Sequence, residues 1–209
     1  DPAKLRQLPN RDGIRFEVIQ QKSHRSGYEH QMELCGASIV TVETRQELES
    51  AINEKTGMMF FLNKAEPDGQ IKSDEFIQVA KKHGVPTMTA AASDATHKEN
   101  LWKYTGKGFD LVIFSGGKAL RGPQSSGLLL GRKDLIEAAL PAMSPFGGIG
   151  RGMKEGKEEL CGLLAARTQR GAGRGAGQEV AQEHFPKPLV VFATRFEASS
   201  TKNLDIERL

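Results

Sequence analysis

The strongest chemical signal in the sequence is a lysine that follows a short apolar run. Residues 111–114 have the composition of a buried strand, and Ser115, Gly116, Gly117 and Lys118 follow directly. Partial removal of water at the end of such a strand favours an uncharged amine, the form that attacks an aldehyde. Glycines let a planar molecule approach the backbone, and Ser115 can donate to a phosphate oxygen. By pattern alone, a surface lysine in a turn is the more common case.

Strands and helices alternate along most of the chain, and this alternation positions the lysine. We expect strands at residues 16–19, 38–42, 58–62, 85–89, 111–114 and 127–130. Helices are expected at residues 28–35, 44–53, 73–84, 100–104, 133–142 and 157–167, the second with a capping box of Thr44 and Glu47. This order predicts an α/β fold, a mostly parallel sheet sandwiched by helices. Ligands of such sheets bind at the carboxyl ends of strands, where Lys118 lies.

The composition is that of a globular protein without a membrane span. The 29 basic residues are interleaved with 26 acidic ones, and the net charge of +3 does not imply a nucleic-acid partner. No apolar run approaches the roughly 18 residues of a membrane span, and the first residues lack signal-peptide features, so we expect a cytoplasmic protein. Cys35 and Cys161 have neither metal-ligand nor disulfide spacing. We therefore expect no metal site and two buried thiols.

The run from Asp110 to Arg132 resembles the cofactor-lysine segment of the bacterial selenocysteine synthase family. That family is also called L-seryl-tRNA selenium transferase, and its relatives include D-glucosaminate-6-phosphate ammonia-lyase. The resemblance covers about residues 1–166, with further matching segments at residues 24–25, 60–64, 100–104 and 148–151. It implies the large domain of a fold-type-I enzyme that uses pyridoxal 5'-phosphate (PLP). Such an enzyme is usually a homodimer or a higher homo-oligomer.

The resemblance also implies roles for particular residues. Lys118 would hold PLP as an internal aldimine, Gly117 would allow its close approach, and Ser115 would support the phosphate or the lysine. Gln124 belongs to the loop after the lysine, which in this fold often approaches the site of a neighbouring subunit. His24 lies just past a strand, where related enzymes place a ring that stacks on the pyridine. The alternative for His24 is an ordinary loop histidine.

Two arginines are candidates for binding the substrate. Arg121 and Arg151 each carry a guanidinium that matches a carboxylate or a phosphate with two parallel hydrogen bonds. Each has a simpler interpretation as a solvated or structural arginine. Asn63 and Lys64 follow the expected strand at residues 58–62 and match the family. They form either part of the ligand edge or an ordinary polar loop.

One residue departs from the family at a position that matters for the chemistry. The family has Asp-Ala-Ala where this chain has Ala-Ala-Ala, and alignment puts the aspartate on Ala90. That acid keeps the pyridine nitrogen protonated, which makes PLP an electron sink. Asp94 lies four residues further on, roughly 13 Å along an extended strand, so we do not expect it to substitute.

The resemblance divides the chain into three parts. Residues 1–145 form a partial PLP-dependent large domain, and residues 146–167 begin a small C-terminal domain. Residues 168–209 form an atypical tail with a Gly/Arg-rich stretch and one expected strand at residues 188–192. The family's phosphate-binding segment would precede Asp1. We therefore expect the large domain to be incomplete at both ends.

These observations lead to three functional hypotheses. The first is a PLP-dependent lyase or transferase that acts on an amino acid or an amino sugar acid through Lys118. The second is a catalytically impaired or non-catalytic remnant of that family, kept as a structural or oligomerisation module. A third makes Arg170 and Arg174 a nucleic-acid contact, but two arginines without interleaved aromatic residues give it little support.

Overall fold

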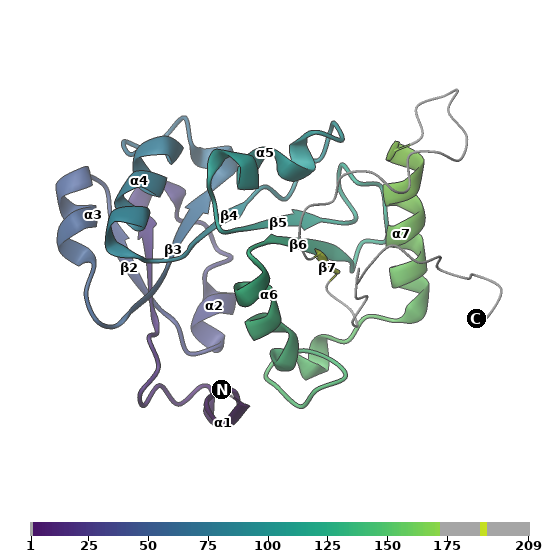
Figure 1. Ribbon diagram of the computed structural model, residues 1–209, viewed down its shortest axis with the longest axis horizontal. Coiled ribbons are helices and arrows are strands. Elements are labelled where there is room, and N and C mark those ends of the chain that lie inside the picture. Colours follow the sequence, from purple (N-terminus) through teal and green to yellow (C-terminus); the bar gives the residue numbers. More distant parts are fainter. Residues whose placement is uncertain (1, 172–188, 192–209) are drawn as a thin grey trace.

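A twisted sheet with helices on both faces forms the centre of the protein (Figure 1). The computed structural model describes residues 2–171 and 189–191. Seven strands pair in the order β2-β1-β3-β4-β5-β6-β7. The first five strands run parallel, whereas β6 is antiparallel to both β5 and β7. The predicted α/β fold with a mostly parallel sheet is confirmed.

The predicted strands and helices occur in the predicted order, with shifts of a few residues at their ends, and α1 precedes them without having been predicted. The strands are β1 (Glu17–Gln21), β2 (Ser38–Val42), β3 (Thr56–Leu62), β4 (Thr87–Ala90), β5 (Leu111–Ser115), β6 (Gly127–Gly131) and β7 (Leu189–Val191). The helices are α1 (Pro2–Gln7), α2 (His30–Leu34), α3 (Arg45–Ala51), α4 (Ser73–His83), α5 (Asn100–Lys107), α6 (Lys133–Ala139) and α7 (Lys157–Gly171). Short 3-10 turns lie at Lys22–His24, Asn63–Ala65, Leu140–Ala142 and Arg151–Met153.

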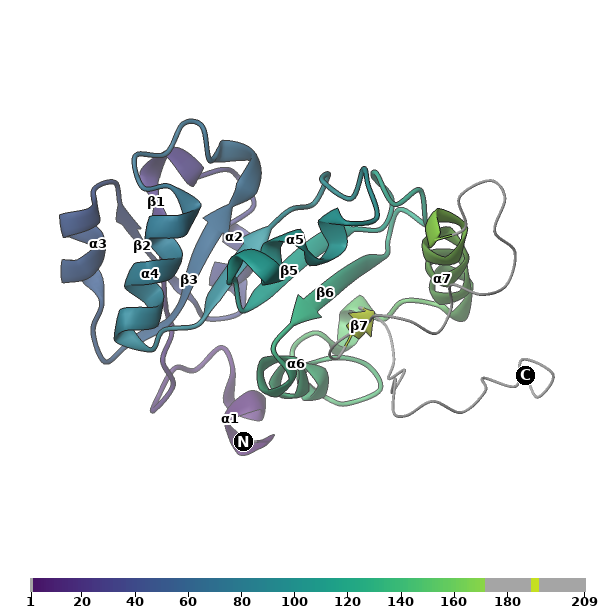
Figure 2. The same ribbon diagram turned by 45° about the horizontal axis from the view of Figure 1, so that its top comes forward.

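The pairing register divides the side chains between two faces of the sheet. Phe61 pairs with Thr89, which pairs with Val112, and because successive side chains alternate, this row lies on one face. Phe61, Thr89 and Val112 are each fully buried there. That face packs against α3, α4, α5 and α7, and we call it the α4 face. Figure 2 shows α4 and α5 lying along the sheet on this side.

The opposite face is covered by α6, and we call it the α6 face. Leu111 and Leu129 on the sheet pack with Ile136 of α6 in a second, smaller core cluster. Leu62, Ala90 and Ile113 form a row on this face, because Leu62 pairs with Ala90 and Ala90 with Ile113. Leu62 and Ile113 are only half-buried. The α6 face is therefore less completely covered than the α4 face at the carboxyl ends of the strands.

Several predicted helix ends are confirmed. Thr44 and Glu47 form the capping box that begins α3, with the Thr44 side chain accepting from the Glu47 backbone N–H. The helix α4 ends at Gly84, whose φ of 65° is a left-handed conformation that glycine adopts without strain. The helix α7 continues to Gly171, past the predicted end at residue 167. The predicted linker and tail otherwise lie outside the described residues, apart from β7 at the predicted strand.

The prediction that both cysteines are buried is wrong. Cys161 is exposed on α7 and Cys35 is half-buried after α2. Leu163 of α7 is buried in the core. Cys161 lies two residues before it and so faces the other side of the helix, toward solvent. Within the described part of the chain, no helix has the length and apolar composition needed to cross a membrane. The same residues include no group of three or more His, Cys, Asp or Glu side chains placed to hold a metal ion.

Replacing the capping threonine tests the first turn of α3. We expect Thr44→Ala to lower the free energy of unfolding by about 1 kcal/mol, because the Glu47 N–H loses its acceptor. Ser50→Ala, at an exposed position of the same helix, is the matched control. It removes a hydroxyl without removing a cap and should be neutral or slightly stabilising. Urea unfolding followed by circular dichroism measures both, and equal effects would contradict the capping role.

Candidate functional site

The predicted lysine lies in a loop that its own hydrogen bonds close. Residues 116–126 connect β5 to β6, with Ser115 and Gly127 paired where the loop begins and ends. The Gly116 N–H donates to the Ser126 carbonyl at 2.8 Å, and the Gly122 N–H donates to the Gly116 carbonyl at 2.7 Å. These bonds close the loop on itself at the carboxyl end of β5. We call residues 116–126 the lysine loop.

The side chain of Lys118 projects from this loop into solvent. Lys118 is exposed, and no carboxylate of the described residues lies within ion-pair distance of its amine. Leu120, only two residues further on, is 1% exposed and belongs to the core of the α4 face. The loop is thus anchored by Leu120 while Lys118 stays accessible. The expected partial removal of water from Lys118 is therefore not observed. What the structure offers for condensation with an aldehyde is an accessible amine without a carboxylate partner among the described residues.

The other predicted residues of the loop lie beside the lysine. Ser115 ends β5 on the α6 face, in the same alternation as Ile113. The Gln124 amide donates to the Gly117 carbonyl at 3.0 Å. A side chain at Gly117 would place its Cβ 2.5 Å from the Cα of Gln124. Only glycine fits at position 117, because the loop backbone crosses itself there.

The two candidate arginines occupy different segments. Arg121 is in the lysine loop, three residues after Lys118, and has a φ of 59°, which is uncommon for a residue with a side chain. Arg151 begins a short 3-10 turn before α7. Both are exposed, and neither guanidinium pairs with a carboxylate of the described residues. The structure therefore brings Arg121, but not Arg151, into one segment with Lys118.

The structure places His24 apart from the lysine loop. Its ring is fully buried and meets the Phe61 ring edge to face, with centroids 4.5 Å apart. Its Nδ1 accepts from the Leu62 backbone N–H at 3.2 Å, and burial lowers its pKa. The His24 ring thus lies beside the carboxyl end of β3, against the Phe61 ring and the Leu62 backbone N–H. The strands β3 and β4 also separate β1, which His24 follows, from the lysine strand β5.

The Ala90 side chain lies in an apolar row at the carboxyl end of β4. Its neighbours on the α6 face are Leu62 and Ile113. Neither neighbour carries a charge, so nothing in that row takes the place of the aspartate that the family pattern has here. At this position the site therefore offers a methyl group where the family offers a carboxylate.

Asp94 belongs to a polar cluster on the other face. Its carboxylate accepts from the Asn63 amide and, at 2.9 Å, from the Tyr104 hydroxyl. The Tyr104 ring packs near Phe114 on the α4 face, with centroids 6.1 Å apart. Burial, together with the hydrogen bond to Asp94, raises the pKa of Tyr104. The Asp94 carboxylate is thus engaged by Asn63 and Tyr104. The expected spacing of roughly 13 Å assumed an extended strand, whereas residues 91–94 form a turn in which the Asp94 N–H donates to the Ala91 carbonyl at 2.9 Å.

Sequence reasoning did not foresee this cluster. Asn63 was a candidate only because it follows a strand at the ligand edge, and Lys64 beside it is exposed. The structure shows that the Asn63 amide also donates to the Tyr104 hydroxyl at 2.9 Å and so ties the turn after β3 to α5. A polar residue directly after one strand and an aspartate after the next were the available signals. Tyr104 gave none, because it fits an ordinary helix face.

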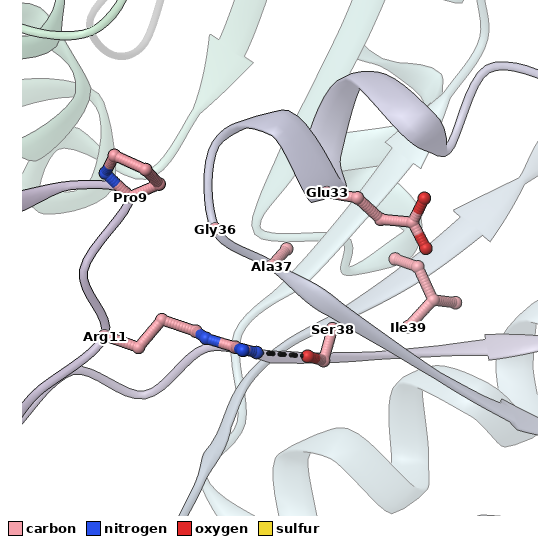
Figure 3. A pocket seen from close by; sticks show the side chains of 7 residues that line it. All are labelled: Pro9, Arg11, Glu33, Gly36, Ala37, Ser38 and Ile39. Atoms are coloured by element: carbon pink, nitrogen blue, oxygen red, sulfur yellow. Dashed lines mark hydrogen bonds between the residues drawn. The ribbon is translucent and has the colours of Figure 1, made fainter.

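A shallow hollow lies at the opposite edge of the sheet (Figure 3). It has a volume of about 510 Å³ and is lined by Pro9, Arg11, Glu33, Gly36, Ala37, Ser38 and Ile39. Arg11 reaches across its floor and donates to the Ser38 hydroxyl at 2.6 Å. Since Ser38 begins β2, the hollow is at the amino ends of the parallel strands. It contains none of the predicted site residues.

Solved structures with the same arrangement identify the class of protein. D-glucosaminate-6-phosphate ammonia-lyase superposes with a TM-score of 0.71 at 35% identity, over 81% of this chain and 47% of that chain. Serine palmitoyltransferase from S. paucimobilis, solved with a bound PLP-myriocin aldimine, has a TM-score of 0.57 over 76% of this chain and 43% of that chain. At 14% identity the latter shows the fold alone. The fold is that of PLP-dependent enzymes of fold type I.

The sequence then gives the family. The aminotransferase class-V family matches residues 17–159, and the chain belongs to this family. D-glucosaminate-6-phosphate ammonia lyase from Salmonella typhimurium (strain 14028s / SGSC 2262) is 35% identical over 177 residues, 79% of this chain and 46% of that protein. L-seryl-tRNA(Sec) selenium transferase from Aquifex aeolicus (strain VF5) is 30% identical over 106 residues, 44% of this chain and 23% of that protein. The chain spans less than half the length of these relatives. The predicted resemblance is confirmed.

The buried histidine makes the stability of the protein depend on pH. The pKa of His24 is lowered from 6.5, so the unfolded chain takes up a proton below pH 6.5 that the folded chain does not. As the pH is lowered below 6.5, the free energy of unfolding should therefore decrease, by up to about 1.4 kcal/mol per pH unit from this group. The decrease should end once the pH reaches the lower pKa of His24 in the folded protein. His24→Asn keeps an acceptor for Leu62 and removes the titration. Urea unfolding across this range should show a flatter dependence for His24→Asn.

The control for this experiment is His83→Asn, because His83 is exposed at the end of α4. The free energy of unfolding of His83→Asn should depend on pH in the same way as that of the unaltered protein. The slopes are compared rather than the absolute stabilities, since His24→Asn also alters the contact with Phe61. Identical slopes for His24→Asn and the unaltered protein would contradict the assignment.

Proposed function

We propose that this chain provides the lysine-bearing part of a PLP-dependent lyase or transferase, with Lys118 as the residue that binds the cofactor covalently. The observation that carries the proposal is the exposed, unpaired Lys118 amine in a closed loop at the carboxyl end of β5. That edge is where open α/β sheets bind ligands. Membership of the aminotransferase class-V family, whose match includes residue 118, supports the same residue.

The residues of the lysine loop fit this cofactor. Bound PLP would supply an electron sink for a carbanion at the substrate α-carbon. The Lys118 amine would attach the cofactor and, once released, remove the α-proton at its Nζ atom. Ser115 would donate to a phosphate oxygen or to the lysine, while Gln124 holds the Gly117 carbonyl and so keeps the loop closed. We assign no stacking role to His24, because its ring is enclosed by the core of the α4 face.

The position of Ala90 limits the chemistry that we propose. With no carboxylate in the row of Leu62, Ala90 and Ile113, nothing there would hold a proton on the pyridine nitrogen. A less protonated ring stabilises the carbanion less, so elimination or replacement should be slow. This observation favours a second candidate function. The chain would then be an impaired or non-catalytic member of the family, kept for its fold or its interfaces.

An anionic amino compound is the substrate class that the exposed arginines favour. Arg121 and Arg151 have no described carboxylate partner, and each guanidinium can bind a carboxylate or a phosphate. Amino acids and amino sugar acids both carry such groups, and the similar ammonia lyase is named for a phosphorylated amino sugar acid. We therefore propose an amino acid or an amino sugar acid as the substrate. We also propose that the protein acts in the cytoplasm.

We also propose a homo-oligomer. Tyr28 and Met153 are 73% and 72% exposed, and Phe146 and Ile149 are also exposed. Large apolar side chains that gather on a surface are typical of protein interfaces. Residues 146–153 provide three of these four side chains within one short segment.

The assignment of Lys118 is tested by trapping. The 209-residue protein is incubated with PLP and reduced with borohydride, and the modified lysine is then located by peptide mass spectrometry. We expect the modification on Lys118 and at least a tenfold loss of incorporated PLP in Lys118→Ala. Lys55→Ala is the control, because Lys55 is exposed directly before β3, at the amino ends of the strands, and should leave incorporation unchanged. Equal labelling of many surface lysines, undiminished by Lys118→Ala, would refute the assignment.

Restoring the acid tests whether Ala90 alone limits the chemistry of the site. We expect Ala90→Asp to raise the PLP-dependent exchange of an amino acid α-proton with deuterium by tenfold or more, because a carboxylate then faces the ring. Ala90→Asn is the isosteric control without the charge. Exchange in both variants is followed by NMR. If Ala90→Asp exchanges no faster than Ala90→Asn, the active-enzyme proposal loses to the non-catalytic alternative.

A further inference from the structure

The helix α7 contacts the lysine loop at two points. A Cβ built on Gly162 of α7 would lie 2.7 Å from the Pro123 Cγ atom. A Cβ built on Gly122 would lie 3.1 Å from the Cδ1 atom of Leu163. The helix thus has a glycine where it meets Pro123 of the loop, and the loop has a glycine where it meets Leu163 of the helix. In both views α7 stands beside the end of the β5–β6 hairpin (Figures 1 and 2).

The glycine in α7 has a cost that this contact explains. Glycine inside a helix is less favourable than alanine by about 1 kcal/mol. Gly162 lies in the interior of the 15-residue helix α7, where alanine would otherwise be preferred. No side chain fits between the helix and Pro123. Close approach of the loop is therefore the physical reason for glycine at position 162.

The contacted residues are the ones that close the loop around the lysine. The Gly122 N–H donates to the Gly116 carbonyl, and the Arg121 N–H donates to the Lys118 carbonyl at 2.9 Å. Leu163 is 1% exposed and shares the core of the α4 face with Leu120 of the loop. A displacement of α7 would thus act on Gly122 and, through these bonds, on the backbone of Lys118.

We propose that Gly162 and Leu163 are positioning residues for Lys118. They hold Gly122 and Pro123 from outside the loop, so that the loop stays closed and the lysine amine keeps its place at the carboxyl end of β5. The importance of this placement for chemistry rests on the proposed function of Lys118. The mechanical link between α7 and the loop does not rest on it.

The test forces α7 and the loop apart. Gly162→Ala adds a methyl group that collides with Pro123. We expect hydrogen exchange at the Gly116 and Gly122 amides to accelerate at least tenfold, because opening the loop breaks their bonds. The rate at which an amine-acylating reagent modifies Lys118, relative to the exposed Lys55 at the amino end of β3, should change as well. PLP trapped on Lys118 should fall at a fixed PLP concentration.

The matched control is Gly106→Ala in α5. Nothing lies within 4 Å of a Cβ at Gly106, so the added methyl group makes no collision. Gly106→Ala should leave the exchange and the Lys118 reactivity unchanged. Pro123→Ala removes the ring carbons with which the new methyl group of Gly162→Ala collides. The double variant should therefore regain much of the protection from hydrogen exchange at the Gly116 and Gly122 amides.

Two results would overturn the proposal. The first is unchanged exchange and unchanged Lys118 reactivity in folded Gly162→Ala. The second is acceleration spread evenly over all strands, which would indicate general destabilisation. If Gly162→Ala does not fold, Leu163→Val probes the same contact with a smaller change and the same two readouts. Failure of the unaltered protein to trap PLP would count against the proposed function alone, since exchange and acylation need no cofactor.

Discussion

The common register of β3, β4 and β5 is the constraint on which the rest of the structure depends. Parallel pairing places residues of equal register on the same face, so one row holds Phe61, Thr89 and Val112 and the next holds Leu62, Ala90 and Ile113. A slip of one residue in β4 would exchange Thr89 for Ala90 and move every side chain of β4 to the opposite face. In β3, the ring contacts of Phe61 with His24, Phe76 and Phe109 fix which face of the strand is buried.

Local signals in the sequence were sufficient for most of the fold. The capping box at Thr44 and the stop at Gly84 depend on residues within one helical turn, so both were readable without the structure. The antiparallel direction of β6 could not be predicted, because a short apolar strand has the same sequence pattern in either direction. Cys161 was misjudged since the face of α7 that meets the core depends on the loop that packs against it.

The candidate site shows the same division between local and distant information. Lys118 and its glycines form one continuous segment, so the sequence was sufficient to single them out. The burial of His24 depends on Phe61, and the Asp94 cluster depends on Asn63, which is 31 residues away in sequence. The contact of Gly162 with Pro123 joins residues that no local pattern connects. Long-range packing decided each of these features.

The site separates two requirements of PLP chemistry that are usually met together. Holding the cofactor needs an accessible amine, which the lysine loop provides with its own hydrogen bonds. Using the cofactor as an electron sink needs a charge beside the ring, and the row around Ala90 provides none. Because the two requirements depend on neighbouring strands rather than on one segment, the proposed site could lose one of them by a single substitution and keep the other.

The antiparallel pairing of β5 and β6 also bears on the order in which the chain folds. Loop closure loses less entropy when the contacting residues are close in sequence. The pair Ser115 and Gly127 satisfies this condition, whereas the parallel pair of β4 and β5 needs a crossover that includes α5. Hairpins form in microseconds, faster than sheets built from distant strands. The pairing of β5 with β6 is thus local in sequence, whereas the lysine loop between them also depends on Leu120 in the core and on its contacts with α7.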